Sequence, residues 1–132
     1  YDYDFFVSGN NFEAYKLIES YNKLPSKLIN ISGPHKSGKS HLAFILKNKL
    51  KAGLFTAQTV EKQTIEYYLK FKNLIIDNYY SPKDISSEFF YSLINQAINI
   101  NQVLIINSLD PLKKMINPLQ DLNSRFDIFL KD

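Results

Sequence analysis

The segment Gly33-Pro34-His35-Lys36-Ser37-Gly38-Lys39-Ser40 decides the fold, because it matches the pattern G-x-x-x-x-G-K-[ST] at every fixed position. The apolar run 28–31 immediately before it predicts a short strand. The segment 41–50 after it predicts a helix, since its apolar residues recur at positions 42, 45, 46 and 50. A glycine-containing loop between a strand and a helix is typical of a phosphate-binding loop.

Each fixed residue of this loop suits one part of a nucleotide's phosphate chain. Gly33 and Gly38 let the backbone turn so that consecutive N–H groups point into one concavity. Lys39 would reach the β- and γ-phosphates, and the Ser40 hydroxyl would bind Mg²⁺. The positive end of the following helix adds to the same anion site. The alternative, a glycine-rich turn that only caps a helix, is disfavoured by the flanking strand and helix. We therefore expect the whole loop to bind phosphate, through Gly33, Pro34, His35, Lys36, Ser37, Gly38, Lys39 and Ser40.

Length and composition limit the remaining classes of protein. A chain of 132 residues, 45% of them hydrophobic, predicts one domain over 1–132 with a substantial core. We find no apolar run near the roughly 20 residues that cross a bilayer and no secretory leader, so we expect a cytoplasmic protein without a membrane partner. The lack of cysteine excludes disulfides and thiolate metal sites. The net charge of +3 is mild, so charge alone does not indicate contact with nucleic acid.

The stretch before the first strand has two open interpretations. Residues 1–7 are aromatic and acidic, and a turn at 8–11 precedes a predicted helix over 12–20. In one interpretation the stretch lies against a nucleotide base, and Val7 belongs to the nucleotide site. In the other it forms an aromatic plug over the edge of the domain.

The chain after the loop alternates between predicted strands and helices, as in a parallel sheet. Residues 54–57, 74–77 and 103–108 are predicted strands, and 127–130 resembles a last one. The predicted helices cover 59–70 and 83–99, with Pro82 in the first turn of the second.

The run Leu74-Ile75-Ile76-Asp77 has the form of a Walker B segment, in which a buried strand delivers one carboxylate to the phosphate side. We expect Asp77 to act beside Mg²⁺, directly or through water. The next residue is Asn78, where enzymes that activate their own water often carry a second carboxylate as base. An amide cannot take a proton at neutral pH, so hydrolysis by the chain itself should be poor and an enzymatic activity stays uncertain.

Two further positions are candidates for contact with the phosphates. Asn107 and Ser108 end the strand 103–108, and the carboxyl ends of parallel strands are where open sheets place ligand groups. Either residue could sense the γ-phosphate, and either could equally cap the strand end.

Arg125 is the only arginine, while the other fifteen basic residues are lysine. A guanidinium pairs bidentately with phosphate or carboxylate in a way that an ammonium cannot. We interpret Arg125 as an arginine finger, a catalytic residue whose guanidinium would act on a nucleotide's phosphates. The alternative is a structural salt bridge to Asp121 or Asp127.

These motifs occur in the order of a known family. The chain resembles the AAA+ core of the bacterial replication initiator DnaA and, more closely, its homologue Hda, which regulates that initiator. The resemblance covers nearly the whole chain and rests on four segments besides the phosphate-binding loop: Phe6-Val7-Ser8-Gly9-Asn10, Ile76-Asp77-Asn78, Phe89 to Asn95, and Leu119-Gln120-Asp121-Leu122-Asn123-Ser124-Arg125-Phe126.

The resemblance implies a three-layer α/β P-loop NTPase fold with a mostly parallel five-stranded sheet of order 5-1-4-3-2. It implies binding of ADP or ATP with Mg²⁺. It also implies a regulatory role, in which Arg125 promotes ATP hydrolysis by the initiator DnaA in the presence of the sliding clamp. A homo-oligomer is compatible with this role, and contact with DNA would be indirect.

The chain also departs from the family pattern. At Leu109-Asp110-Pro111-Leu112 the family has Asp-Arg-Pro-Pro, so a sensor aspartate is either lost or displaced to Asp110. The helical lid, the DNA-binding domain and the clamp-binding motif of relatives lie outside 1–132. Two rival functions stay open: an autonomous DnaA-like initiator ATPase, and a DNA-associated module in which nucleotide only stabilises the fold.

Overall fold

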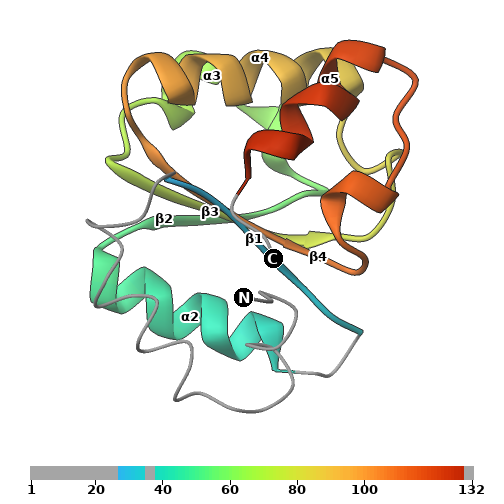
Figure 1. Ribbon diagram of the computed structural model, residues 1–132. Coiled ribbons are helices and arrows are strands. Elements are labelled where there is room, and N and C mark those ends of the chain that lie inside the picture. The colour runs from blue at the N-terminus through green and yellow to red at the C-terminus, as the bar shows by residue number, and fades with distance from the viewer. Residues whose placement is uncertain (1–26, 35–37, 130–132) are drawn as a thin grey trace.

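Four parallel strands form the central sheet of the computed structural model, which describes residues 27–34 and 38–129 (Figure 1). Their order in the sheet is β1-β4-β3-β2, and each neighbouring pair is parallel. The strands are β1 (Leu28–Ser32), β2 (Gly53–Thr56), β3 (Asn73–Tyr79) and β4 (Val103–Ser108). The α/β class and the predicted order of these strands are confirmed.

The predicted fifth strand is wrong within the described residues. The segment Phe126–Ile128 is a 3-10 helix, η5, and Phe129 N–H donates to the carbonyl of Phe126 at 3.3 Å. Phe126 and Phe129 are both buried. A spacing of three residues brings both rings to one side of a helical turn, whereas in a strand they would point to opposite faces. The described sheet therefore has four strands in place of the predicted five.

Helices cover both faces of the sheet and create three layers (Figure 1). Among the described residues, one face carries the single helix α2 (Lys39–Leu50). The other carries α3 (Ile65–Tyr68), α4 (Ser87–Asn99) and α5 (Gln120–Arg125), with a short 3-10 helix η4 (Leu112–Lys114) after β4.

Side chains of the central strands alternate between two cores. Ile75 and Ile105 pack with α2, while Ile76 and Ile106 pack with α4 and α5. Because both faces are covered, these strands are nearly continuous apolar runs, and this is why the sequence predicted them well.

The predicted helix over 59–70 is wrong as a single element. The chain forms a 3-10 helix, η3 (Val60–Lys62), and then the short α3. Gln63 between them has an extended backbone, and the Thr64 hydroxyl accepts from the N–H of Tyr67 at 3.2 Å, which starts a new helix. The break lets the Tyr67 and Tyr68 rings pack edge to face against Phe55.

The predicted helix over 83–99 exists but begins at Ser87. The Asp84 carboxylate accepts from the N–H groups of Tyr80 at 2.7 Å and Ser81 at 3.1 Å, which closes a turn at this point. The Ser86 hydroxyl then accepts from the Phe89 N–H at 3.3 Å as the cap of α4. Pro82 therefore belongs to the turn, and its predicted place in the first helical turn is wrong.

A buried amide on β1 provides a test of this arrangement. Asn30 Nδ2 donates to the carbonyl of Ile106 at 3.0 Å and to Ser108 Oγ at 2.9 Å, and its Oδ1 accepts from the Leu112 N–H at 3.0 Å. Asn30→Asp removes both donated bonds and buries a charge, so the free energy of unfolding in urea should fall by about 1–3 kcal/mol. Asn48→Asp on the exposed side of α2 is the matched control and should change it little. An equal effect of the two changes would contradict the role of Asn30.

Candidate nucleotide-binding site

The carboxyl ends of β1, β4 and β3 meet at one edge of the sheet. The Gly33 N–H donates to the carbonyl of Ser108 at 3.1 Å, so the loop after β1 leaves the sheet beside the end of β4. In this order of strands, the loop after β1 and the last residues of β3 flank the end of β4. The sheet topology thus brings three of the predicted segments together.

The start of α2 depends on the backbone of one glycine. Gly38 has φ 97°, in the left-handed region that residues with a Cβ rarely adopt, and it stands at the cap position of the helix. Its carbonyl accepts from the Leu42 N–H at 2.9 Å, and no side chain caps the helix. The first N–H groups of α2 therefore have no side-chain acceptor, and an anion could take that place. Ser40, in the first turn, is exposed.

Lys39 is buried, with 6% of its surface exposed, although it carries a charge. Its Nζ donates to the carbonyl of Gly33 and, at 2.9 Å, to the carbonyl of Pro34. Burial lowers the pKa of Lys39, and the nearby Asp77 carboxylate partly offsets this shift. The ammonium is therefore held by neutral acceptors of its own loop, and its charge is available to phosphate.

Asn107 connects the first residue of α2 to Asp77, the predicted Walker B carboxylate. Its Nδ2 donates to the Lys39 carbonyl at 3.1 Å and to Asp77 Oδ1 at 3.2 Å. All three residues are buried, and Asn107 Oδ1 has no hydrogen-bond partner among the described residues. A buried acceptor without a partner is costly, so this oxygen is suited to a ligand donor or water.

Ser108 and Asp110 belong to a different contact. Ser108 Oγ accepts from Asn30 and donates to the Asp110 carbonyl at 2.6 Å. Asn107, in contrast, lies against Lys39 and Asp77. Of the two sensor candidates, the structure thus brings Asn107 to the site and uses Ser108 to hold the turn after β4. The Asp110 side chain is exposed.

The described residues fit a nucleotide with Mg²⁺. Oxygen ligands are what Mg²⁺ prefers, and the Ser40 hydroxyl and the Asp77 carboxylate supply two at the same edge of the sheet. One or two such side chains plus substrate phosphates are the usual protein contribution to a Mg²⁺ site. Lys39 adds the cation that a phosphate chain requires. Among the described residues no group of three or more His, Asp or Glu side chains is placed to hold a metal by itself.

Asn78 occupies the position of the expected second carboxylate, and its side chain is engaged. It has φ 63°, and the pairing of β3 with β4 shifts register between Ile76 and Tyr79. The Tyr80 hydroxyl donates to Asn78 Oδ1 at 2.8 Å. Burial, followed by the charges of Asp77 and Asp84, raises the pKa of Tyr80. Sequence reasoning missed this partner, because a tyrosine after a strand gives no signal beyond packing.

Arg125 belongs to a different part of the fold. It ends α5, on the face of the sheet opposite to α2 (Figure 1). Its Nε donates to Asn95 Oδ1 at 2.7 Å, and its Cζ lies 5.7 Å from the centre of the Tyr91 ring. These neutral groups on α4 are its described partners, in place of the Asp121 or Asp127 carboxylates considered from the sequence. Both residues belong to the segment Phe89 to Asn95 that carries part of the family resemblance, but sequence reasoning gave neither of them a role.

Several predicted site residues fall outside the described ranges. They are Val7, His35, Lys36 and Ser37, together with the predicted helix over 12–20.

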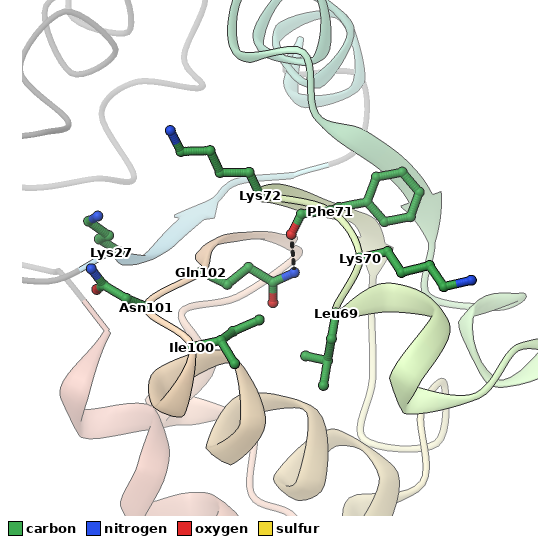
Figure 2. A pocket seen from close by; sticks show the side chains of 8 residues that line it. All are labelled: Lys27, Leu69, Lys70, Phe71, Lys72, Ile100, Asn101 and Gln102. Carbon is green, nitrogen blue, oxygen red and sulfur yellow. Dashed lines mark hydrogen bonds between the residues drawn. The ribbon is translucent and has the colours of Figure 1, made fainter.

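A separate hollow of about 360 Å³ opens at the amino ends of the strands (Figure 2). None of the predicted site residues lines it. Gln102 forms part of its wall and donates to the Phe71 carbonyl at 2.7 Å, while the side chains of Lys72 and Lys70 extend in different directions (Figure 2). The hollow is therefore distinct from the site around Lys39, which lies at the opposite ends of the strands.

The helices of the described part are all too short or too polar to cross a bilayer.

Comparison with protein-family models and with curated proteins gives no match. Solved structures do match. AMPPCP-bound DnaA from Aquifex aeolicus aligns with a TM-score of 0.68 and 21% identity, over 91% of this chain and 45% of that one. The replication initiator DnaA bound to AMPPCP and single-stranded DNA gives 0.71 and 21%, over 98% and 48%. Domain III of Thermotoga maritima DnaA gives 0.59 and 19%, over 98% and 64%.

These similarities establish the fold. The α/β domain with its parallel sheet has the architecture of the DnaA structures, and the chain spans about half the length of the first two. The sequence identities are too low to carry function from one protein to the other.

Removal of the Lys39 ammonium should weaken nucleotide binding. A charge-assisted hydrogen bond contributes about 1.5–3 kcal/mol, so Lys39→Ala should raise the Kd for ADP by roughly 10- to 100-fold in calorimetric titrations. Lys47→Ala, at the exposed end of α2, removes the same charge outside the site and should leave the Kd unchanged. Equal affinities for the wild type and Lys39→Ala would exclude Lys39 as a phosphate ligand.

The affinity should also depend on pH in one direction. Burial lowers the pKa of Lys39 below its ordinary value of 10.5, and phosphate requires the charged form. The affinity for ADP should therefore be highest at pH values below that lowered pKa and fall as the pH rises through it. Titrations from about pH 7 to about pH 10 test this, because an ordinary lysine would still be largely charged there. Lys39→Ala should bind weakly and show no such alkaline loss, whereas the same loss in this variant would assign it to another group.

Proposed function

We propose that this chain is a DnaA-type AAA+ core that binds an adenine nucleotide with Mg²⁺ and acts in the control of chromosomal replication initiation. The observation that carries the proposal is the contact of Lys39, Asp77 and Asn107 at the carboxyl ends of the strands. The DnaA fold supports it, and two of the matched DnaA structures are bound to AMPPCP.

The described residues divide the work of holding the nucleotide. Lys39 would exchange its bonds to the Gly33 and Pro34 carbonyls for bonds to phosphate oxygens. Ser40 and Asp77 would hold Mg²⁺, which neutralises phosphate charge when bound. Asn107 already donates from Nδ2 to Asp77 and to the Lys39 carbonyl, so its unpartnered Oδ1 would accept from a water that in turn donates to the γ-phosphate, and in this way it would distinguish ATP from ADP.

Weak hydrolysis by the chain itself follows from Asn78. General base catalysis needs a group that can take a proton from water, and a carboxamide cannot. Its Oδ1 already accepts from the Tyr80 hydroxyl. The domain should therefore keep ATP or ADP bound, and it should hydrolyse bound ATP to ADP only slowly.

The finer proposal is a regulatory, Hda-like role. Arg125 ends α5, on the face of the sheet opposite to α2, and this arrangement supports an action outside the chain's own nucleotide site. An arginine in trans stabilises the charge that develops on a transferring phosphoryl group, an effect of about 10³–10⁵ in known systems. The proposed recipient is ATP bound to the initiator DnaA, with the sliding clamp as a further partner by resemblance.

An initiator-like function is the second candidate. The favouring observation is that the matched structures are DnaA itself, one of them with single-stranded DNA. An initiator would hydrolyse ATP on its own or on self-assembly, whereas a regulator would accelerate hydrolysis by a different protein. Turnover by the purified chain alone, across a range of concentrations, separates these two functions.

Loss of the Arg125 guanidinium should strongly lower stimulation and spare nucleotide binding. The chain is mixed with its cognate initiator, clamp and DNA, and ATP hydrolysis is followed by phosphate release. Arg125→Ala should lower the stimulated rate by at least about tenfold, a conservative part of the effect of an arginine finger. Its Kd for ADP should stay unchanged, because Arg125 and Lys39 belong to helices on opposite faces of the sheet.

The control for this experiment is Lys114→Ala, which removes one exposed positive charge from η4. It should stimulate like the wild type. If Arg125→Ala also stimulates fully, the finger assignment is wrong. If the chain alone hydrolyses ATP as fast as the mixture, the initiator-like function is correct.

A further inference from the structure

Arg125 is held by two residues of α4 that no motif marks as functional. Tyr91 and Asn95 are one helical turn apart, so both side chains lie on the side of α4 that meets α5. Asn95 Oδ1 accepts from Arg125 Nε at 2.7 Å, and the Tyr91 ring lies 5.7 Å from Cζ.

Both of these partners are neutral. An arginine with only a structural role usually pairs with a carboxylate, and Asp121 is available one turn earlier on α5. The described hydrogen bond goes to the Asn95 amide instead. The full positive charge of the guanidinium is therefore fixed in place without being neutralised, which suits an anion supplied from outside.

The nitrogen of Arg125 that forms this hydrogen bond determines which part of the guanidinium remains unbonded. The Asn95 contact uses Nε, and no contact among the described residues uses the two terminal nitrogens. A guanidinium bonded at Nε keeps the paired N–H groups of its fork free for phosphate oxygens.

The position of α5 does not depend on this contact. Leu122 and Phe126 are buried in the core, and Asn123 exchanges two hydrogen bonds with the backbone of Asn117, at 2.8 and 3.0 Å. A change at Asn95 should therefore alter the orientation of Arg125 and leave the helix in place.

We propose that Asn95, supported by Tyr91, is a positioning residue that presents the uncompensated guanidinium of Arg125 to the phosphates of a nucleotide bound by a neighbouring chain. This inference rests on the proposed function of Arg125 in trans. It adds that the charge must be held by a neutral acceptor, because a charged one would compete with the phosphate.

The substitution Asn95→Asp tests this requirement, since it keeps the shape and strengthens the bond to Arg125. In the mixture with initiator, clamp and DNA, the maximal stimulated rate should fall by about tenfold, as expected when a carboxylate neutralises the finger. The concentration for half-maximal stimulation and the melting temperature should stay close to those of the wild type. If Asn95 were only structural, the stronger bond would preserve the maximal rate.

The matched control is Asn99→Asp, which adds the same charge one turn further along α4 at an exposed position. It should stimulate normally. Asn95→Ala should lower the maximal rate as well, because Arg125 loses its orientation. Full stimulation by Asn95→Asp, or an equal loss in Asn99→Asp, would overturn the proposal.

A double variant distinguishes the positioning role of Asn95 from the proposed function of Arg125. In the Arg125→Ala background, Asn95→Asp should cause no further loss, since Asn95 acts through Arg125. A further loss would overturn the positioning role. If Arg125→Ala lowers stimulation and Asn95→Asp does not, the inference fails and the proposed function stands. If Arg125→Ala has no effect, the proposed function fails and this inference fails with it.

Discussion

Parallel pairing with both faces covered is the constraint that places the polar residues of this domain. Ile75 and Ile105 face α2, so the residues two positions later, Asp77 and Asn107, continue on the same side where the strands leave the core. Their amide–carboxylate contact and the bond from Asn107 to the Lys39 carbonyl follow from this alternation. The candidate site is thus a direct extension of the hydrophobic core.

The register shift between Ile76 and Tyr79 interrupts this alternation in β3. Tyr79 has the same parity as Asp77 and would face α2 in a regular strand. The shift at Asn78, with its positive φ, turns Tyr79 to the other core instead, where its ring packs 5.2 Å from that of Phe90. The one extra residue in β3 therefore lets Asp77 face the candidate site while Tyr79 packs against α4.

The four described strands could be predicted from the sequence, because buried apolar runs and a phosphate-binding loop are strong local signals, and their order was predicted from the family resemblance. The sequence did not allow the break before Thr64 to be predicted, since that break depends on Tyr67 and Tyr68 packing against Phe55, a contact distant in sequence. The residues that surround Lys39 were predictable from motifs and strand ends. The partner of Arg125 was not, because the pairing of Arg125 with Asn95 spans 30 positions and involves no opposite charge.

The two functional cations of the proposal are held in the same way. Lys39 donates to carbonyls of its own loop, and Arg125 donates to a side-chain amide, so hydrogen bonds orient both groups without cancelling their charge. A buried or ordered cation bonded only to neutral acceptors costs stability, and that cost is recovered when an anion binds. The two cations lie on opposite faces of one sheet, so a single nucleotide cannot satisfy both. A phosphate chain on Lys39 and a second one, carried by another protein, on Arg125 would do so, and this is the physical basis of the proposal that the domain acts between chains.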